Sequence, residues 1–129
     1  MLNSRRSIKF TAAHLALALA LSSCASVDGV TTSVIAEKRV EHVISGHGTP
    51  TVVFENGLGA HLEWWAQILP EVARESRTFA YNRPGTGASA NASTPRDGRT
   101  IVDELRRMLR EKGIAPPYIL VGHSPSECP

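Results

Sequence analysis

The chain has 129 residues, a length that fits one modest domain. Its 14 Lys and Arg residues nearly balance its 12 Asp and Glu residues, which leaves a net charge of only +2. No basic stripe with interleaved aromatic residues remains, so the sequence excludes a typical nucleic-acid-binding surface. A hydrophobic content of 42% excludes wholesale disorder. We therefore expect a globular domain that binds no nucleic acid.

Residues 1–23 have the pattern of a secretory signal peptide. Three basic residues precede an apolar run over residues 10–21, which is too short to cross the about 30 Å core of a bilayer comfortably. Residues 21–24 (Leu-Ser-Ser-Cys) resemble a bacterial lipobox, in which the cysteine is lipidated and becomes the new N-terminus. We expect an exported protein that contacts a membrane only through lipidated Cys24, or, with a plain signal peptide, a periplasmic or extracellular one. Cys128 is the one other cysteine, so no disulfide framework is expected.

Residues 24–39 carry no strong pattern, and we interpret them as a flexible tether. Strands are predicted over residues 40–45 and 51–55, the second as a β-branched apolar run typical of a strand buried on both faces. Apolar residues at helical spacing then predict a helix over residues 62–72. Pro70 lies inside it and is expected to break or restart it.

The same alternation continues towards the C-terminus. Residues 78–81 read as a strand and are followed by a loop rich in Pro, Gly, Ser and Asn. A helix is expected to begin at Thr100, which with Asp103 has the spacing of a capping box. A last apolar strand is predicted over residues 118–121. Strand, helix, strand, helix, strand is the order of an α/β fold with an open, mostly parallel sheet and flanking helices.

Three segments in this order match one known pattern. Residues 54–59 (Phe-Glu-Asn-Gly-Leu-Gly) end a strand in a Gly-rich loop, and residues 81–89 (Tyr-Asn-Arg-Pro-Gly-Thr-Gly-Ala-Ser) follow the next strand. Residues 117–124 (Pro-Tyr-Ile-Leu-Val-Gly-His-Ser) lead a strand into a sharp turn. Together they resemble the α/β-hydrolase family, with Asn56 where its oxyanion loop carries His and Asn82 where its second motif carries Asp. The resemblance implies that residues 40–124 are the N-terminal, incomplete part of this fold.

The resemblance also implies a chemistry. It makes Ser124 the nucleophile at the elbow and His123 the variable residue before it. A serine hydroxyl must be deprotonated by a histidine that a carboxylate orients. The backbone N–H of Leu58 would be one oxyanion donor. A nucleophilic serine favours an esterase, lipase or peptidase-like reaction on a small-molecule ester or amide, with neither cofactor nor metal.

The pattern fails directly after the nucleophile. Pro125 has no N–H to serve as the second oxyanion donor, and loss of one such donor costs about 10²–10³ in rate. Ser126 replaces the closing glycine of the elbow. In this family the acid and base follow the nucleophile, and none of His42, His47 and His61 occupies the base position, so we expect them to be loop or surface histidines. The chain is therefore expected to be truncated and inactive.

Residues 125–129 are interpreted as an aberrant tail. Dropping two bases from the degenerate codons of Pro-Ser-Glu-Cys-Pro permits Leu-Gly-Val, which would restore the elbow as Gly-His-Ser-Leu-Gly. The alternative function is thus a frameshifted, non-catalytic lipoprotein fragment. In either case the last strand, central in the full fold, would become an exposed hydrophobic edge.

Other ligand-binding motifs are incomplete. Residues 57–59 begin a dinucleotide fingerprint, but Leu62 occupies the position of the third glycine. Residues 85–89 lack the lysine of a phosphate-binding loop, and the histidines show no metal-ligand spacing. Trp64 and Trp65 could form a ligand platform, although Trp65 falls on the apolar face and is expected in the core.

Overall fold

The computed structural model describes residues 26–123. The predicted signal peptide, Cys24, Ser124 and the tail over residues 125–129 lie outside these residues. The elements, in chain order, are β1 (Thr31–Ile35), β2 (Lys38–Ser45), β3 (Thr51–Glu55), the 3-10 helix η1 (Leu62–Trp65), α2 (Leu69–Val72), β4 (Arg77–Tyr81), α3 (Gly98–Glu111) and β5 (Tyr118–Gly122). Within the described residues, no helix has both the length and the apolar character needed to cross a bilayer.

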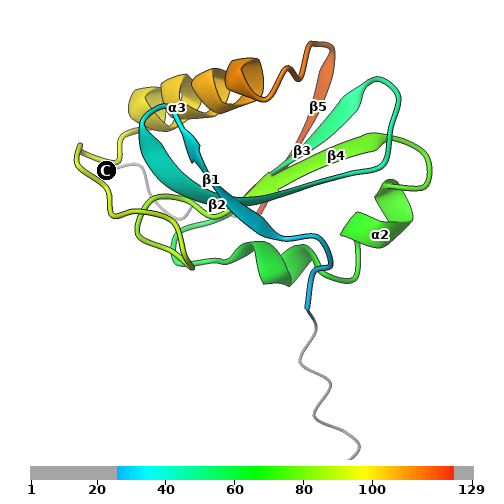
Figure 1. The fold of residues 1–129 in the computed structure, drawn as a ribbon, viewed down its shortest axis with the longest axis horizontal. Helices are drawn as coiled ribbons and strands as arrows, with labels where there is room; N and C mark the ends of the chain where they lie inside the picture. Colours follow the sequence, from blue (N-terminus) through cyan, green and yellow to red (C-terminus); the bar gives the residue numbers. More distant parts are fainter. Residues whose placement is uncertain (1–25, 124–129) are drawn as a thin grey trace, which may run out of the picture.

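The strands form one sheet in the order β1-β2-β4-β3-β5 (Figure 1). β3 is central and pairs in parallel with β4 on one side and β5 on the other. β2 pairs antiparallel with both β1 and β4, so it alone of the five runs against the common direction. The predicted α/β fold with a mostly parallel sheet is confirmed, and it positions three strand ends at one edge.

The prediction of a flexible tether over residues 24–39 is wrong for its second half, where β1 and the start of β2 lie. β1 pairs along its whole length with β2, and Ile35 is buried in the core. The hairpin turns at Ala36 and Glu37, both in the left-handed conformation at φ 52° and 65°. Such turns are normally signalled by Asn, Asp or Gly. The strand was missed because neither turn residue belongs to this group.

Two apolar clusters hold the layers together. One lies between the sheet and α3, and its buried members are Ile35, Val40, Val53, Phe79, Tyr81, Met108, Leu109 and Ile114. The other lies on the opposite face, beneath η1 and α2, and its buried members are Val43, Val52, Phe54, Trp65, Leu69 and Ala80. Figure 1 shows the helices on these two sides of the sheet. β3 supplies residues to both clusters, as expected for a strand buried on both faces.

The helix predicted over residues 62–72 is split in two. η1 ends at Trp65, and α2 begins one residue before Pro70, which therefore lies in the first turn. Proline is tolerated there because the amide it lacks would have no partner within the helix. The predicted break is confirmed, and its consequence is a short η1 directly after the glycine-containing loop that follows β3.

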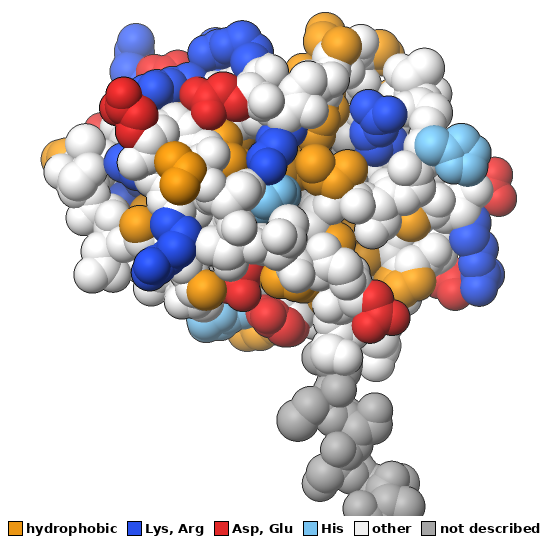
Figure 2. All heavy atoms as spheres, viewed as in Figure 1, with side chains coloured by type: hydrophobic (Ala, Val, Ile, Leu, Met, Phe, Trp, Pro, Cys, Tyr) orange, Lys and Arg blue, Asp and Glu red, His pale blue; other side chains and the backbone are white. Residues whose placement is uncertain are grey.

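The start of α3 differs from the expected capping box. Asp97 is the N-cap, and its carboxylate accepts a hydrogen bond of 2.8 Å from the backbone N–H of Thr100. Thr100 is thus the third helical residue and not the cap, and Asp103 is exposed. Charged side chains crowd the outer face of α3, at the upper left of Figure 2. Its apolar face packs on the sheet through Met108 and Leu109.

Candidate functional site

The carboxyl ends of β3 and β5 meet at one edge of the sheet. Glu55, the last residue of β3, is in register with Gly122, the last of β5. The amide of His123 continues this ladder by donating to the carbonyl of Glu55 at 3.2 Å. The loop that carries Leu58 follows β3, and His123, which precedes Ser124 in the sequence, follows β5. Both therefore lie at the same edge of the sheet. Ser124 itself lies outside the described residues.

The loop after β3 is a tight turn whose middle faces outward. The N–H of Ala60 donates to the carbonyl of Gly57 at 3.2 Å, and Leu58 is 72% exposed. Within residues 26–123, no hydrogen bond engages the backbone N–H of Leu58. The amide of Leu58 is therefore left without a protein partner in the part of the chain that the structure describes.

Asn56, which stands where the family has histidine, is a buried strut. Its Nδ2 donates to the carbonyl of Tyr81 at 2.8 Å, and its Oδ1 accepts from Nε1 of Trp65 at 2.6 Å. The side chain thereby joins the loop to β4 and to η1. Both ends of the amide are engaged, as a fully buried polar group requires.

Asn82 performs the same task after β4. It is fully buried; its Oδ1 accepts from the N–H of Leu62 at 2.7 Å, and its Nδ2 donates to Oε2 of Glu41 at 2.7 Å. The hydroxyl of Ser89 donates to the carbonyl of Asn82 at 2.8 Å. The second motif is thus folded back on β2 and tied to the start of η1.

A charged cluster links the ends of β3 and β4. Glu55 accepts hydrogen bonds of 2.6 Å from the hydroxyl of Tyr81 and from Nε of Arg83. Burial and the adjacent Glu55 carboxylate raise the pKa of Tyr81 well above its ordinary value of 10.0. The hydroxyl therefore stays protonated and donates to Glu55, which also forms an ion pair with Arg83.

A cavity of about 190 Å³ opens beside this edge. Its lining residues are Asn56, Ala60, Trp64, Trp65, Ile68 and His123. The imidazole of His123 lies edge-on to both indoles, with ring centroids 5.6 Å from Trp64 and 6.3 Å from Trp65. Trp65 is 7% exposed and packs on Phe54, which confirms that it belongs to the core. The sequence did not predict that His123 lines this cavity, since it marked His123 only as the variable residue before Ser124.

The remaining histidines lie elsewhere. His47 and His61 are exposed, as expected. The expectation of a loop or surface position is wrong for His42, which is on β2 and 2% exposed. Burial lowers the pKa of His42, although a hydrogen bond with the carbonyl of Val40 opposes this effect. An alternating strand places His42 on an inner face, and the neutral ring is accommodated against Phe79.

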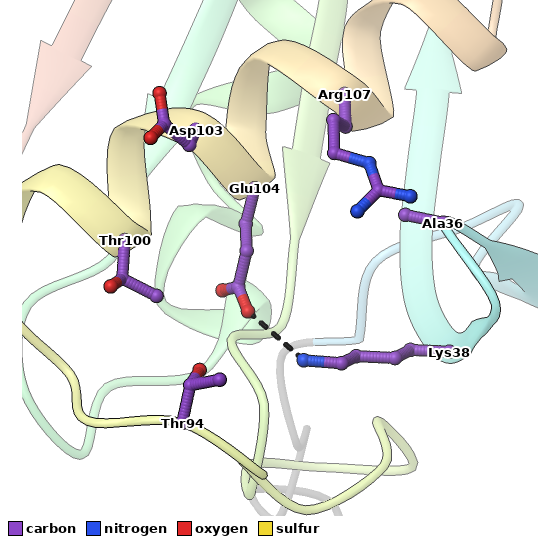
Figure 3. Close-up of a pocket in the computed structure, with 7 residues that line it drawn as sticks. All are labelled: Ala36, Lys38, Thr94, Thr100, Asp103, Glu104 and Arg107. Atoms are coloured by element: carbon purple, nitrogen blue, oxygen red, sulfur yellow. Dashed lines mark hydrogen bonds and ion pairs between the residues drawn. The ribbon is translucent and has the colours of Figure 1, made fainter.

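A second, larger hollow of about 260 Å³ lies between α3 and the β1–β2 hairpin (Figure 3). Glu104 projects into it and pairs with Lys38 at 3.2 Å and Arg96 at 2.6 Å. Burial raises the pKa of Glu104, but the hydrogen bonds and charges of these two partners outweigh burial and hold it below its ordinary value of 4.5. The central charge is compensated by protein groups. In the part of the chain described, no cluster of three His, Cys, Asp or Glu side chains is suited to a metal ion.

Comparisons with known proteins agree with this architecture. The family model described as the alpha/beta hydrolase fold matches residues 50–124. The uncharacterized protein YqjL of Bacillus subtilis is 34% identical over 79 residues, which are 61% of this chain and 31% of that protein. An AB hydrolase superfamily protein of Gibberella zeae is 32% identical over 76 residues, 58% of this chain and 24% of its own length. The chain spans about a third of these relatives or less.

Solved structures show the same fold. The epoxide hydrolase CorEH superposes with a TM-score of 0.65 at 24% identity, covering 73% of this chain and 32% of its own. The enol-lactonase from Burkholderia xenovorans gives a TM-score of 0.65 at 21% identity, covering 73% of this chain and 37% of its own. Because this family model matches more than half of the chain, the chain belongs to the α/β-hydrolase fold family.

Proposed function

We propose that this chain derives from a serine hydrolase that cleaves carboxylic esters or amides. The hydroxyl oxygen of Ser124 would attack the carbonyl carbon, its proton passing to a base, and the N–H of Leu58 would stabilise the oxygen that becomes negative. The alcohol or amine then leaves, and water releases the acyl group. The observation that carries the proposal is the register of Glu55 with Gly122, which brings the Leu58 loop beside the end of β5.

The choice of acyl transfer rests on the serine. Structural relatives include both an epoxide hydrolase and an enol-lactonase. A lactone is a cyclic ester, and its opening is an acyl transfer to which an oxyanion hole and a serine are suited. The amide of Leu58 supports the same chemistry, because no protein group among the described residues accepts a hydrogen bond from it and Leu58 is exposed.

The chain of 129 residues is proposed to be inactive itself. Pro125 lacks the N–H that would complete the oxyanion hole. Ser126 places a side chain where the strained elbow favours glycine. Two histidines of the described residues are also unsuited as the base, since His42 is buried and the exposed His61 is not at the family's base position.

Sequencing the gene through codon 124 and beyond tests the proposal first. We expect a shifted frame that continues with Leu-Gly and later supplies an acidic residue and a histidine. The product of that frame should hydrolyse p-nitrophenyl butyrate. Ser124→Ala should reduce turnover by at least about 10³-fold, while Thr94→Ala, on an exposed loop, should leave it unchanged. Hydrolysis that persists in Ser124→Ala would refute the assigned nucleophile.

A non-catalytic protein is the second candidate, and the residue after Ser124 favours it. Pro125 has no N–H to offer an oxyanion. If no reading frame continues the fold and the purified chain shows no esterase activity above background, this candidate stands and the family describes ancestry alone.

Export and lipidation are proposed on the sequence pattern of residues 1–24. Mass spectrometry of the chain expressed in a Gram-negative host should detect a diacylglyceryl group on Cys24 and removal of residues 1–23. Cys24→Ser should abolish the modification and the membrane association. A mature chain that begins elsewhere, with an unmodified Cys24, would favour the plain signal peptide.

A further inference from the structure

The cavity beside β5 has the size of one compact organic group. Its volume of about 190 Å³ somewhat exceeds that of an engineered cavity that binds benzene, about 150 Å³. His123, which lines it, directly precedes Ser124. A group held there would lie within one residue of the proposed nucleophile.

The polar atoms deepest in the lining are already used. The amide of Asn56 bonds to Trp65 on one side and to the Tyr81 carbonyl on the other. Ala60 is buried and Ile68 contributes only hydrocarbon. No Asp, Glu, Lys or Arg belongs to the lining set. Apart from the imidazole of His123 and the indole N–H of Trp64, the lining offers no polar side chain to replace the water around a charged or strongly hydrated group, whereas an apolar group would lose nothing.

Trp64 forms an outer wall that is apolar and unusually open. It is 61% exposed, and the neighbouring Ile68 is 48% exposed. The indole lies edge-on to the imidazole of His123, which borders the cavity beside it. Burial of such a ring by a ligand is favourable, because it removes apolar surface from water. Trp65, in contrast, is fixed in the core and forms the floor.

We infer that this cavity binds the apolar part of the ester, an uncharged and compact group of about six carbons, and that Trp64 determines this specificity. The role of this cavity in ester cleavage rests on the proposed function, whereas the binding of an apolar ligand to it does not. The substrates would be esters of short branched or cyclic acids or alcohols.

The composition of the chain gives a direct assay. Trp64 and Trp65 are the two tryptophans of the whole sequence, and both line the cavity. Both fluorophores of the full 129-residue chain therefore border the cavity. We would titrate 3,3-dimethyl-1-butanol and, as its charged isostere, choline. The pair separates an apolar pocket from an aromatic cage for quaternary ammonium.

We expect saturable quenching or enhancement by the neutral alcohol and at least about tenfold weaker binding of choline. Trp64→Ala should weaken binding of the alcohol about tenfold, with Trp65 as the remaining reporter. Ala60→Leu should abolish it by filling the cavity. Val34→Ala, 75% exposed on β1, is the matched control and should bind as the parent does.

The outcomes are decisive in both directions. If Ala60→Leu fails to fold, judged by near-ultraviolet circular dichroism, Trp64→Ala and Ile68→Ala carry the test. Equal or tighter binding of choline would overturn the inference, as would a Trp64→Ala affinity equal to that of Val34→Ala. Because no turnover is measured, a failed pocket leaves Ser124 untouched, and a failed esterase assay leaves the pocket standing.

Discussion

Two glycines in the turn between β2 and β3 share a backbone conformation but differ in their surroundings. Gly46 and Gly48 have φ values of 66° and 93°, a region that costs a residue with Cβ about 1–2 kcal/mol. A Cβ on Gly46 would collide with the backbone carbonyl oxygens of Ala73 and Ser76, whereas one on Gly48 meets no atom within 4 Å. Glycine is thus required at position 46 because neighbouring backbone atoms leave no room for a Cβ. At position 48 it is favoured only by the positive φ angle.

This difference predicts unequal losses of stability. Gly48→Ala should lower the free energy of unfolding by about 1–2 kcal/mol. Gly46→Ala should lower it by at least about 2 kcal/mol more, because backbone atoms must move. Urea denaturation followed by far-ultraviolet circular dichroism measures both. Similar losses for the two variants would show that the segment over residues 73–76 relaxes freely.

At the same scale, the sequence located the two substituted asparagines but not their bonds. Asn56 and Asn82 stand out because a known motif has other residues there. Their partners come from segments distant in the chain, such as the Trp65 indole and the Leu62 amide. A motif records which position matters; the contacts that explain an amide at that position arise only when β3 and β4 are paired.

Among the elements, those with a strong internal period were predicted and those set by tertiary pairing were not. The strands over residues 51–55 and 118–121 agree with β3 and β5 to within one residue. β1 escaped detection because Thr-Thr-Ser-Val-Ile has little alternation and its hairpin turn carries no Gly or Asn. Its stability comes from pairing with β2 and from packing of Ile35 against the α3 side.

The start of α3 gives a prediction at this scale. Hydrogen bonds from the amide and hydroxyl of Thr100 lower the pKa of Asp97 below its ordinary value of 3.8. The folded state therefore favours the carboxylate, and this stabilisation is present above pH 3.8 and lost as the pH falls through the lowered pKa. Asp97→Ala should shift the urea midpoint downwards at pH 7 and leave it nearly unchanged well below pH 3.8.

Asp103→Ala is the control for the cap. Asp103 has the spacing that suggested a capping box, but it is exposed and accepts no hydrogen bond from the first turn among the described residues. Its removal should change the midpoint little at any pH. Equal effects of the two alanine variants at pH 7 would mean that general charge at the helix start, and not the cap, supplies the stability.

For the whole molecule, the two edges of the sheet are not alike. β1 is short and largely polar, and it is closed by a hydrogen bond of 2.6 Å between the Ala36 amide and Glu111 of α3. β5 presents three consecutive exposed apolar residues and, within residues 26–123, pairs only with β3. An open apolar strand of this kind is a template for pairing with another chain. The expected hydrophobic edge is therefore present in the structure.

This asymmetry predicts concentration-dependent association through β5. The 129-residue chain should sediment as oligomers or larger aggregates at micromolar concentration, and Leu120→Lys should shift the distribution towards monomer, because a charged edge opposes strand addition. Val34→Lys places the same charge on the opposite edge at a residue that is 75% exposed, and it should have the smaller effect. Analytical ultracentrifugation of the three proteins at matched concentrations measures the difference.

If Val34→Lys suppresses association as well as Leu120→Lys does, net charge and not the β5 edge governs the association. If neither variant changes it, the contact between chains lies on another face, and the exposed strand is tolerated as it is.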